Sequence, residues 1–345
     1  MAESSDVLRW GILGTGKVAG DFVKAFTNTK KPHALLAVAA MAGTDKAETF
    51  IEENKLAEAK AYGEYQEVLD NDEIDIVYIG TQTQWHYEWA DKALDANKHV
   101  LVETPIAVTA SQVEKLAEKA KEKERFLMEA FWSRFFPAYT EIKRLCEAED
   151  FGKPKFVNCN FGFKVEQSTP STGRTIMSTI GCYCVSLAQF VFGGEAEEVK
   201  AVGETDDEQD GAEKWASINI KFGDDKNALI HTDSRVFLPN TAFVTFENGY
   251  VEIPEWMHAP TKLKYYQMGG DDGWGEHAQK EFRLDDRRQF VYPNSTGFRY
   301  EQDHVYECIK GGDLESPVMS LADSIAIRKV IDEARDQIGI PQPDV

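Results

Sequence analysis

The residues with the clearest spacing for binding chemistry are the glycines near the start of the chain. Gly14, Gly16 and Ala19 form a G-x-G-x-x-A pattern within R-W-G-I-L-G-T-G-K-V-A-G at 9–20. One glycine permits a tight turn, the next lets phosphates approach the backbone, and the small third residue lets a helix pack on a strand. Backbone N–H groups of the helix N-terminus then face a pyrophosphate. The motif predicts a dinucleotide site, and the alternative is a glycine-rich turn that binds nothing.

This turn needs an apolar strand before it and an amphipathic helix after it. The chain is apolar from Leu8, and a helix is expected from about Lys17. Strands and helices then alternate to about Arg125, which predicts a parallel sheet covered on both faces. Ligands of such sheets bind beyond the carboxyl ends of the strands. The expected strands are 34–41, 74–80, 98–102 and 126–129, and the expected helices are 45–54, 66–69, 85–96 and 110–124.

The second half of the chain has a different pattern. Several strand-like runs follow one another without helices between them, and Asn248-Gly249 is a strong hairpin signal. This predicts an α/β domain with an open, largely antiparallel sheet, whose apolar outer face is a candidate subunit interface. We expect two domains, 1–130 and 131–345. The expected strands are 155–165, 198–203, 215–222, 228–237, 242–246 and 250–253, and the expected helices are 139–148, 176–192, 298–310 and 321–338.

Composition excludes several classes of partner. The 345 residues carry a formal net charge of -21, which argues against nucleic acid and anionic membranes as ligands. No apolar run reaches the ~18 residues that a membrane helix needs, and M-A-E-S-S-D does not resemble a signal peptide. The five cysteines have neither C-x-x-C nor zinc spacing. We therefore expect a cytoplasmic protein without a bound metal.

Four further motifs resemble a known family. They are I-G-T-Q-T-Q-W-H at 79–86, H-V-L-V-E-T-P-I-A at 99–107, M-E-A-F-W-S-R-F-F-P-A at 128–138 and E-S-P-V-M-S-L-A-D-S at 315–324. The chain resembles the glucose-fructose oxidoreductase / inositol dehydrogenase / MocA family. Within it, the chain is similar to the branch of dimeric dihydrodiol dehydrogenase and NADP-dependent D-xylose dehydrogenase. The resemblance implies an N-terminal Rossmann domain, a substrate-binding domain that dimerises through its sheet, and hydride transfer between a nicotinamide and a sugar or cyclic diol.

The chain departs from the family at the positions that carry catalysis. The E-K-P motif is E-T-P here, with Thr104 in place of the lysine. The second signature is G-R-T-I-M-S-T-I-G-C-Y at 173–183, in which Thr179 replaces an aspartate. Tyr183 keeps the position of the catalytic tyrosine or histidine. The resemblance therefore implies that Tyr183, Thr104 and Thr179 occupy the catalytic positions.

These substitutions affect the direction of the chemistry. A tyrosine titrates near ~10 and is a poor base at neutral pH unless an ammonium favours its ionised form. Thr104 supplies no ammonium, whereas reduction of a carbonyl needs only a neutral Tyr183 that donates its proton. Thr104 and Thr179 then orient a substrate oxygen by hydrogen bonds. We expect an NAD(P)H-dependent carbonyl reductase; the alternatives are a lyase, isomerase or cyclase, or a silent binding protein, on the same scaffold.

The cofactor is expected at the ends of the first strands. No acidic residue stands in Ala37–Met41, about 20 positions past the glycines, where NAD-binding proteins place one. Thr44 and Lys46 follow instead, which favours NADP(H), although Asp45 is a late candidate for the ribose hydroxyls. The expected cofactor contacts are Gly14, Thr15, Gly16, Lys17, Val18, Thr44, Thr81, His86 and Glu103.

Further residues are candidates for the substrate pocket, and each has a structural alternative. The aromatic candidates are equally consistent with packing at a domain junction, and Arg134 with an interdomain salt bridge. Lys164 and Arg174 are also consistent with solvent-exposed positions. For His86, a structural or cofactor-adjacent role is favoured over proton transfer. The expected pocket residues are Trp132, Arg134, Phe135, Lys164 and Arg174.

Overall fold

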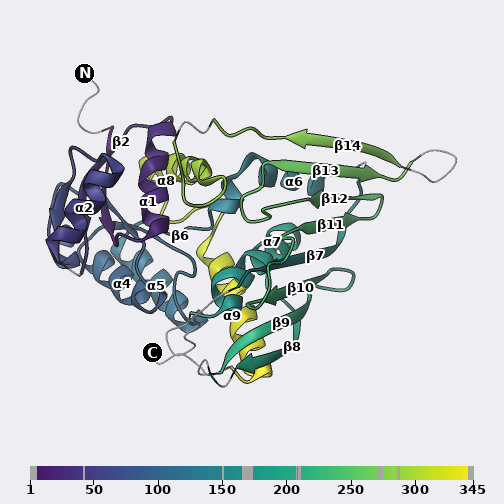
Figure 1. The fold of residues 1–345 in the computed structure, drawn as a ribbon. Helices are drawn as coiled ribbons and strands as arrows, with labels where there is room; N and C mark the ends of the chain where they lie inside the picture. The colour runs from purple at the N-terminus through teal and green to yellow at the C-terminus, as the bar shows by residue number, and fades with distance from the viewer. Residues whose placement is uncertain are drawn as a thin grey trace. The chain divides into compact units, whose positions relative to one another are not determined.

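The computed structural model describes residues 6–41, 43–149, 151–164, 174–206, 208, 211–269, 275–285 and 288–340. The chain divides into two compact units, and neither is continuous in sequence (Figure 1). The first unit comprises residues 1–107, 111–132 and 285–321, and the second comprises 108–110, 133–284 and 322–345. Residues 285–321 thus pack with the first unit although they follow the second sheet in sequence. The domain boundary expected after residue 130 stays a prediction.

The described part of the first unit contains a parallel sheet of six strands in the order β3-β2-β1-β4-β5-β6. The chain leaves β1 toward β2 on one side and later returns to pair β4 on its other side. This reversal of strand order creates the crevice in which doubly wound sheets bind ligands. The strands are β1 Leu8–Leu13, β2 His33–Ala39, β3 Lys60–Tyr62, β4 Ile76–Ile79, β5 His99–Val102 and β6 Leu127–Glu129. The helices are α1 Lys17–Ala25, α2 Thr44–Asn54, α3 Tyr65–Leu69, α4 His86–Asp95, α5 Ala110–Lys123 and α8 Phe298–Gly311, with short 3-10 turns at Phe26–Asn28, Thr83–Trp85, Trp132–Phe135 and Ser295–Gly297.

Aromatic packing fixes α1 against this sheet. Trp10 of β1 is fully buried and meets Phe22 of α1 edge-on at 5.8 Å between ring centroids. Phe22 in turn stacks on Tyr78 of β4 at 3.9 Å. Each such buried ring stabilises the fold by about 1.5–3 kcal/mol. The N-terminus of α1 is therefore held in a defined position beside the end of β1.

Residues 285–321, which follow the second sheet in sequence, also pack on helix α1. Phe298, the first residue of α8, lies 5.7 Å from Phe22 between ring centroids. The buried carboxylate of Asp21 accepts hydrogen bonds from the backbone N of Val291 at 2.9 Å and from Ser295 Oγ at 2.8 Å. Hydrogen bonds to a buried charge are among the stronger ones in proteins. They explain why this distant segment belongs with the first unit.

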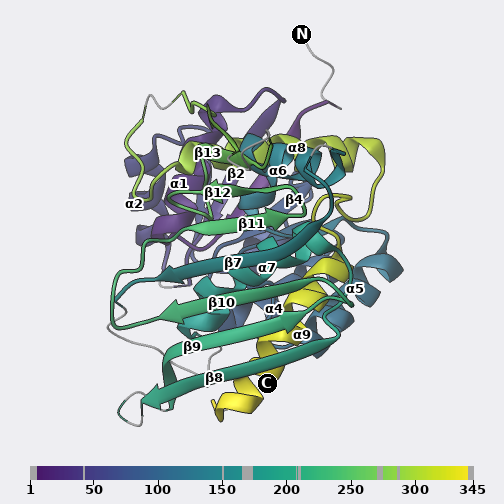
Figure 2. The same cartoon turned by 90° about the vertical axis from the view of Figure 1, so that its right-hand side faces the viewer.

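The described part of the second unit is built on a mixed sheet of eight strands in the order β14-β13-β12-β11-β7-β10-β9-β8. β7 and β10 pair in parallel, and the other neighbours pair antiparallel. Figure 2 shows the broad face of the sheet with α7 and α9 behind it. The strands are β7 Pro154–Gly162, β8 Glu198–Asp206, β9 Ala212–Lys221, β10 Asn227–Asp233, β11 Ala242–Phe246, β12 Gly249–Ile253, β13 Lys262–Gln267 and β14 Glu276–Glu281. The helices are α6 Pro137–Glu147, a π-helix at Met177–Gly181, α7 Cys182–Phe192 and α9 Leu321–Ile338.

The expected fold class is confirmed, with differences in detail. The sequence missed β3, β13 and β14, because β3 is short and β13 alternates lysines with only one deeply buried residue, Leu263. The expected strand 228–237 ends at Asp233, whose carboxylate binds the backbone N and guanidinium of Arg235 and so forms a turn. The hairpin expected at Asn248-Gly249 joins β11 and β12.

The exposed face of the second sheet carries apolar side chains. Val202 and Leu229 are 64% and 39% exposed, and Tyr250 and Tyr266 stack at 4.3 Å.

Among the helices that the structure describes, none has both the length and the apolar character needed to cross a bilayer.

Candidate active site

A cavity of about 550 Å³ lies at the carboxyl ends of β1, β2 and β4 in the first unit. Its wall includes the turn between β1 and α1, the residues that follow β2 and β4, and side chains from α2 and α4. This is the crevice at the reversal of strand order, where a dinucleotide is expected. The lining residues are Gly14, Thr15, Gly16, Ala40, Met41, Lys46, Tyr65, Gly80, Thr81, Gln82, Trp85, Glu88 and Trp89.

The two glycines of the turn have different physical roles. Gly14 has a φ of +107°, and a Cβ there would lie 2.5 Å from the backbone oxygen of Gly80. Gly16 has an ordinary φ of -74° and precedes α1, and a Cβ there would meet only that same oxygen at 4.0 Å. Gly14 is thus required by the turn, whereas Gly16 leaves open space at a helix N-terminus whose first N–H groups lack partners within the helix. The cradle fits a pyrophosphate.

The expected cofactor residues divide into two groups. Gly14, Thr15, Gly16 and Thr81 line the cavity. The other expected cofactor residues are close in sequence to these four residues or follow other strands of the same sheet. Lys17 and Val18 form the first turn of α1, Thr44 begins α2, and His86 and Glu103 follow β4 and β5.

His86 connects the segments that follow β4 and β5. Its ring is buried, with Nδ1 2.8 Å from the carbonyl oxygen of Pro105 and Nε2 3.2 Å from that of Thr81. Burial lowers the pKa of His86, so the imidazole is neutral and donates from one nitrogen only. These contacts agree with the structural role considered for His86.

Glu103 stands at the end of β5, immediately before Thr104. Tyr78 donates its hydroxyl to Glu103 Oε1 at 2.7 Å, and the backbone N of Thr104 donates to Oε2 at 3.2 Å. Burial raises the pKa of the Glu103 carboxyl to about 7, although these two hydrogen bonds lower it. The negative charge of Glu129 adds to the rise. This carboxyl therefore titrates near neutral pH.

Sequence reasoning missed a second carboxyl in the same unit. Glu301 of α8 is fully buried, and neither of its carboxyl oxygens has a hydrogen-bond partner among the described residues. Burial raises the pKa of Glu301 well above its usual range, and the charge of Glu103 adds to the rise. The pattern Phe298, Glu301, Gln302 and Val305 marks one helix face, but nothing in the sequence indicates which strand that face covers.

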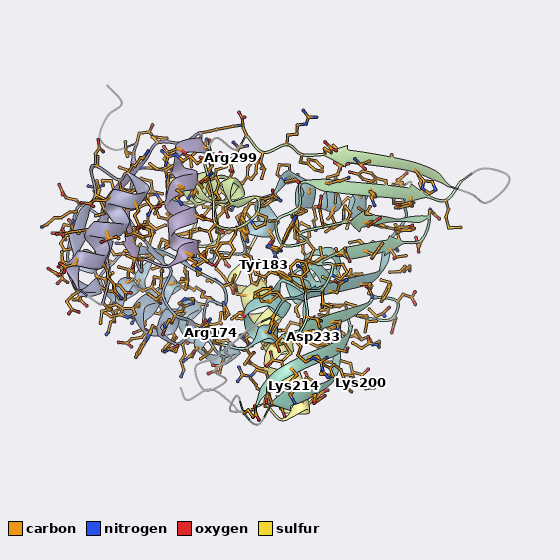
Figure 3. All side chains as sticks on the ribbon, viewed as in Figure 1. Arg174, Tyr183, Lys200, Lys214, Asp233 and Arg299 are labelled. Atoms are coloured by element: carbon orange, nitrogen blue, oxygen red, sulfur yellow. The ribbon has the colours of Figure 1, made fainter. Side chains whose placement is uncertain are left out.

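Tyr183 lies at the start of α7 in the second unit. Its half-buried side chain, labelled in Figure 3, belongs to an aromatic cluster. Its ring centroid is 5.8 Å from that of His258 and 6.2 Å from that of Phe161, and His258 stacks on Phe161 at 4.5 Å. The cluster holds the phenol in a defined orientation.

The turn before Tyr183 is a π-helix and not the start of a regular α-helix. Glu213 anchors it by accepting a hydrogen bond from the backbone N of Met177, and Arg328 donates to Ser178 Oγ at 3.3 Å. Thr179 donates its hydroxyl to the carbonyl oxygen of Thr175 at 2.7 Å. The single hydroxyl hydrogen of Thr179 is thus used within its own turn, and its oxygen is left to act as an acceptor. Single π-turns are frequent at functional sites.

The expected pocket residues lie in different environments. Trp132 is buried in the first unit and stacks on Phe298 at 4.2 Å. Arg134 is buried in the second unit, where it forms an ion pair with Asp323 at 2.7 Å and also contacts Ser186 and Gln189. This ion pair lies within one unit and is not the interdomain salt bridge considered as the alternative. Phe135 is half-buried, and Lys164 and Arg174 are exposed.

Comparisons with known proteins agree with this architecture. Residues 8–131 match the family model described as "Oxidoreductase family, NAD-binding Rossmann fold", and residues 139–252 match the "GFO/IDH/MocA C-terminal domain". The chain is 34% identical to the trans-1,2-dihydrobenzene-1,2-diol dehydrogenase of Xenopus tropicalis, covering 97% of this chain and 99% of the relative. It is 31% identical to the same enzyme of Homo sapiens, covering 97% and 98%.

Solved structures share the fold. A 3-ketoreductase from Actinomadura kijaniata in complex with NADP and TDP-benzene matches with a TM-score of 0.81 at 18% identity, covering 96% of this chain and 98% of that chain. An aldose-aldose oxidoreductase from Caulobacter crescentus matches with a TM-score of 0.81 at 23% identity, covering 96% and 97%.

The glycine turn, the parallel sheet and these matches define an NAD(P)-dependent oxidoreductase that acts on CH–OH or C=O groups. The chain belongs to the glucose-fructose oxidoreductase / inositol dehydrogenase / MocA family.

Proposed function

We propose that this chain reduces a carbonyl group of a sugar-like or cyclic diketone substrate with NADPH, and that Tyr183 donates the proton. The observation that carries the proposal is the open cradle at Gly16, combined with a tyrosine kept at the family's catalytic position and a threonine in place of its lysine. The relatives named as diol dehydrogenases support a cyclic substrate with adjacent oxygens.

The chemistry balances with the residues present. A reduced nicotinamide cofactor, held by Gly14, Thr15, Gly16 and Thr81, would supply the hydride for the carbonyl carbon and would become oxidised. Tyr183 donates the phenol proton to the carbonyl oxygen, which completes the alcohol and leaves a phenolate that regains a proton from solvent. The acceptor oxygen of Thr179 and the hydroxyl of Thr104 orient the substrate by hydrogen bonds. The reverse reaction needs Tyr183 to ionise first, which is unfavourable at neutral pH without a nearby ammonium.

The remaining assignments are part of the same proposal. Gly14, Thr15, Gly16 and Thr81 hold the cofactor, with Lys17, Val18, Thr44, His86 and Glu103 beside them. Trp132, Phe135, Lys164 and Arg174 belong to the substrate side, and the buried Arg134 positions its neighbours there. We also propose a cytoplasmic homodimer that buries the exposed face carrying Val202 and Leu229.

The direct test compares the two directions of the reaction with the whole chain. Oxidation of NADPH with a panel of ketoses and cyclic diketones at neutral pH is expected to exceed reduction of NADP⁺ with xylose or cyclic diols. The rate with alcohols is expected to rise with pH, because the phenol must ionise before it accepts a proton. Faster polyol oxidation at neutral pH would refute the proposed direction. Cofactor binding without turnover in either direction would favour a non-redox enzyme or a silent binding protein.

The choice of NADPH is tested at Lys46. This lysine lines the cavity with Met41, just beyond β2, where the adenosine ribose of a dinucleotide binds. Lys46→Ala is expected to weaken NADPH binding about tenfold and to change NADH binding little, because the ammonium interacts with the additional phosphate. The matched control is Lys121→Ala, which removes an exposed lysine of α5. Equal losses for the two cofactors, measured by fluorescence titration, would mean that Lys46 does not discriminate between them.

A further inference from the structure

Two buried arginines of α9 meet at one serine of the second unit. Arg328 and Arg335 are seven residues apart, so they lie on the same face of this helix, and they are 3% and 0% exposed. Arg328 Nη2 donates a hydrogen bond to Ser178 Oγ at 3.3 Å, and Arg335 Nη1 lies 3.5 Å from the same oxygen. A hydroxyl oxygen accepts two hydrogen bonds. The two guanidinium groups therefore occupy both acceptor positions of Ser178, which is itself fully buried.

Side chains also bind the backbone at the start of this π-helix. Glu213 of β9 accepts a hydrogen bond from the backbone N of Met177, and Thr175 Oγ1 accepts one from the backbone N of Ser178 at 3.2 Å. The first N–H groups of a helix lack carbonyl partners within it, so side chains satisfy them where they are buried. The π-helix is thus held from β9, from α9 and from the residues that immediately precede it.

The anchored turn leads directly into Tyr183. A Cβ at Gly181, the last residue of the π-helix, would lie 2.9 Å from Thr232 Cγ2 of β10, so the turn packs closely on the sheet. A π-helical turn contains about one residue more than an α-helical turn, and each residue of an α-helix rotates the chain by about 100°. Relaxation of the turn into a regular α-helix would change the angle between Tyr183 and the anchored residues by a similar amount. The contacts of Ser178 therefore bear on the direction in which the phenol points.

Stability alone does not explain these buried charges. Arg328 Nε also forms an ion pair with Asp332 at 3.0 Å. Burial lowers the pKa of Arg335 to about 10, and the charge of Arg328 adds to the fall, so Arg335 stays charged at neutral pH. Replacement of buried ionic groups by apolar side chains is often neutral or stabilising, whereas such groups can serve to specify one conformation. Two guanidinium groups on one neutral hydroxyl fit the second role.

We propose that Arg328 and Arg335, acting through Ser178, are positioning residues that hold the π-helix and so direct the phenol of Tyr183 at the substrate. The inference rests on the proposed function, because the direction of the phenol matters to the reaction only if Tyr183 donates the proton. Neither arginine needs to touch the substrate or the cofactor. Loss of these contacts slows proton donation and leaves NADPH affinity unchanged, since the glycine turn belongs to the first unit.

The first experiment measures the anchoring without turnover. Ser178→Ala removes the shared hydroxyl and keeps a residue that favours helices. In the whole chain without cofactor, amide hydrogen exchange of residues 176–184 is expected to become about tenfold faster in this variant, because the turn opens more often. The exchange of the second sheet should stay as in the wild type.

The second experiment tests whether the turn acts through Tyr183. Ser178→Ala is expected to lower kcat for NADPH oxidation with the best carbonyl substrate about tenfold, with little change in KM or in NADPH affinity. In the Tyr183→Phe background the same substitution should cause no further loss, because the proton donor is already absent. If Ser178→Ala does not fold, Arg328→Lys, which keeps a charge beside Asp332 but removes a donor from Ser178, is expected to give the same results.

The matched control is Ser324→Ala, which removes a buried hydroxyl of α9 that has no hydrogen-bond partner among the described residues. It should change neither exchange nor kcat. Unchanged exchange in Ser178→Ala, an unchanged kcat, or an equal loss in the Tyr183→Phe background would each overturn this inference while the proposed function stands. Absence of NADPH oxidation in the wild type would overturn the proposed function and, with it, the role inferred for the turn.

Discussion

Replacement of Tyr183 by phenylalanine is expected to slow carbonyl reduction by a factor of about 10²–10⁴ while NADPH affinity stays unchanged. The phenol is the proposed source of the proton, and Thr104 offers no charged group in its place. The ring itself contacts His258 and Phe161 through its faces and edges, so a phenylalanine keeps this packing. The measurement is kcat for NADPH oxidation with the best carbonyl substrate, beside fluorescence titration of NADPH.

Tyr250→Phe is the matched control, because it removes a hydroxyl from a tyrosine on the exposed face of the second sheet. It should leave kcat unchanged. If Tyr183→Phe retains full kcat, another group donates the proton and the proposed role of Tyr183 is wrong. A loss confined to KM would instead indicate that Tyr183 binds the substrate without transferring a proton.

Gly16→Val is expected to weaken binding of either form of the cofactor by at least about 100-fold without loss of folding stability. The backbone of Gly16 has a conformation that valine adopts freely, and a Cβ there meets nothing closer than 4.0 Å. The added methyls would occupy the space into which the phosphates must come. The free energy of unfolding should change by less than about 0.5 kcal/mol.

Two other glycines make this prediction specific. Gly14→Ala is expected to destabilise the protein itself, because its Cβ would lie 2.5 Å from a backbone oxygen in a left-handed conformation. Gly269→Val should affect neither property, since no atom of the described residues lies within 4 Å of its added Cβ. Normal cofactor affinity in Gly16→Val would show that the phosphates bind elsewhere. Fluorescence titration and thermal unfolding separate these three outcomes.

Local patterns sufficed for much of the fold. The apolar runs before Gly14 and Gly80 gave the strands that frame the cavity, and the helix 321–338 was predicted with the bounds that the structure has. The strand Lys262–Gln267 was missed because its pairing with β12 and β14 depends on register and not on its own apolar content. Contacts distant in sequence, such as that of Asp21 with Val291, cannot be inferred from the residues on either side of them.

The residues of the candidate site also divide into those that a local motif marks and those that only the fold brings into place. The glycine turn, Thr104 and Tyr183 are candidates that the sequence itself supplies, because motifs mark them. Glu301 was not, because its complete burial depends on α8 packing with the first unit, although this helix follows the second sheet in sequence. The π-helix before Tyr183 was missed as well. Its first residue, Met177, is hydrogen-bonded to Glu213 on strand β9, which is distant in sequence.

The central claim is that reduced nicotinamide bound at the glycine turn delivers a hydride to a carbonyl. The most direct measurement uses NADPH with deuterium at the transferable position of C4, together with a carbonyl substrate, and examines the product by mass spectrometry and NMR. We predict one deuterium on the former carbonyl carbon, and far less of this product in the same time when Gly16→Val replaces the wild type at equal NADPH concentration. Product without deuterium, or deuterium retained on the cofactor throughout, would contradict the account.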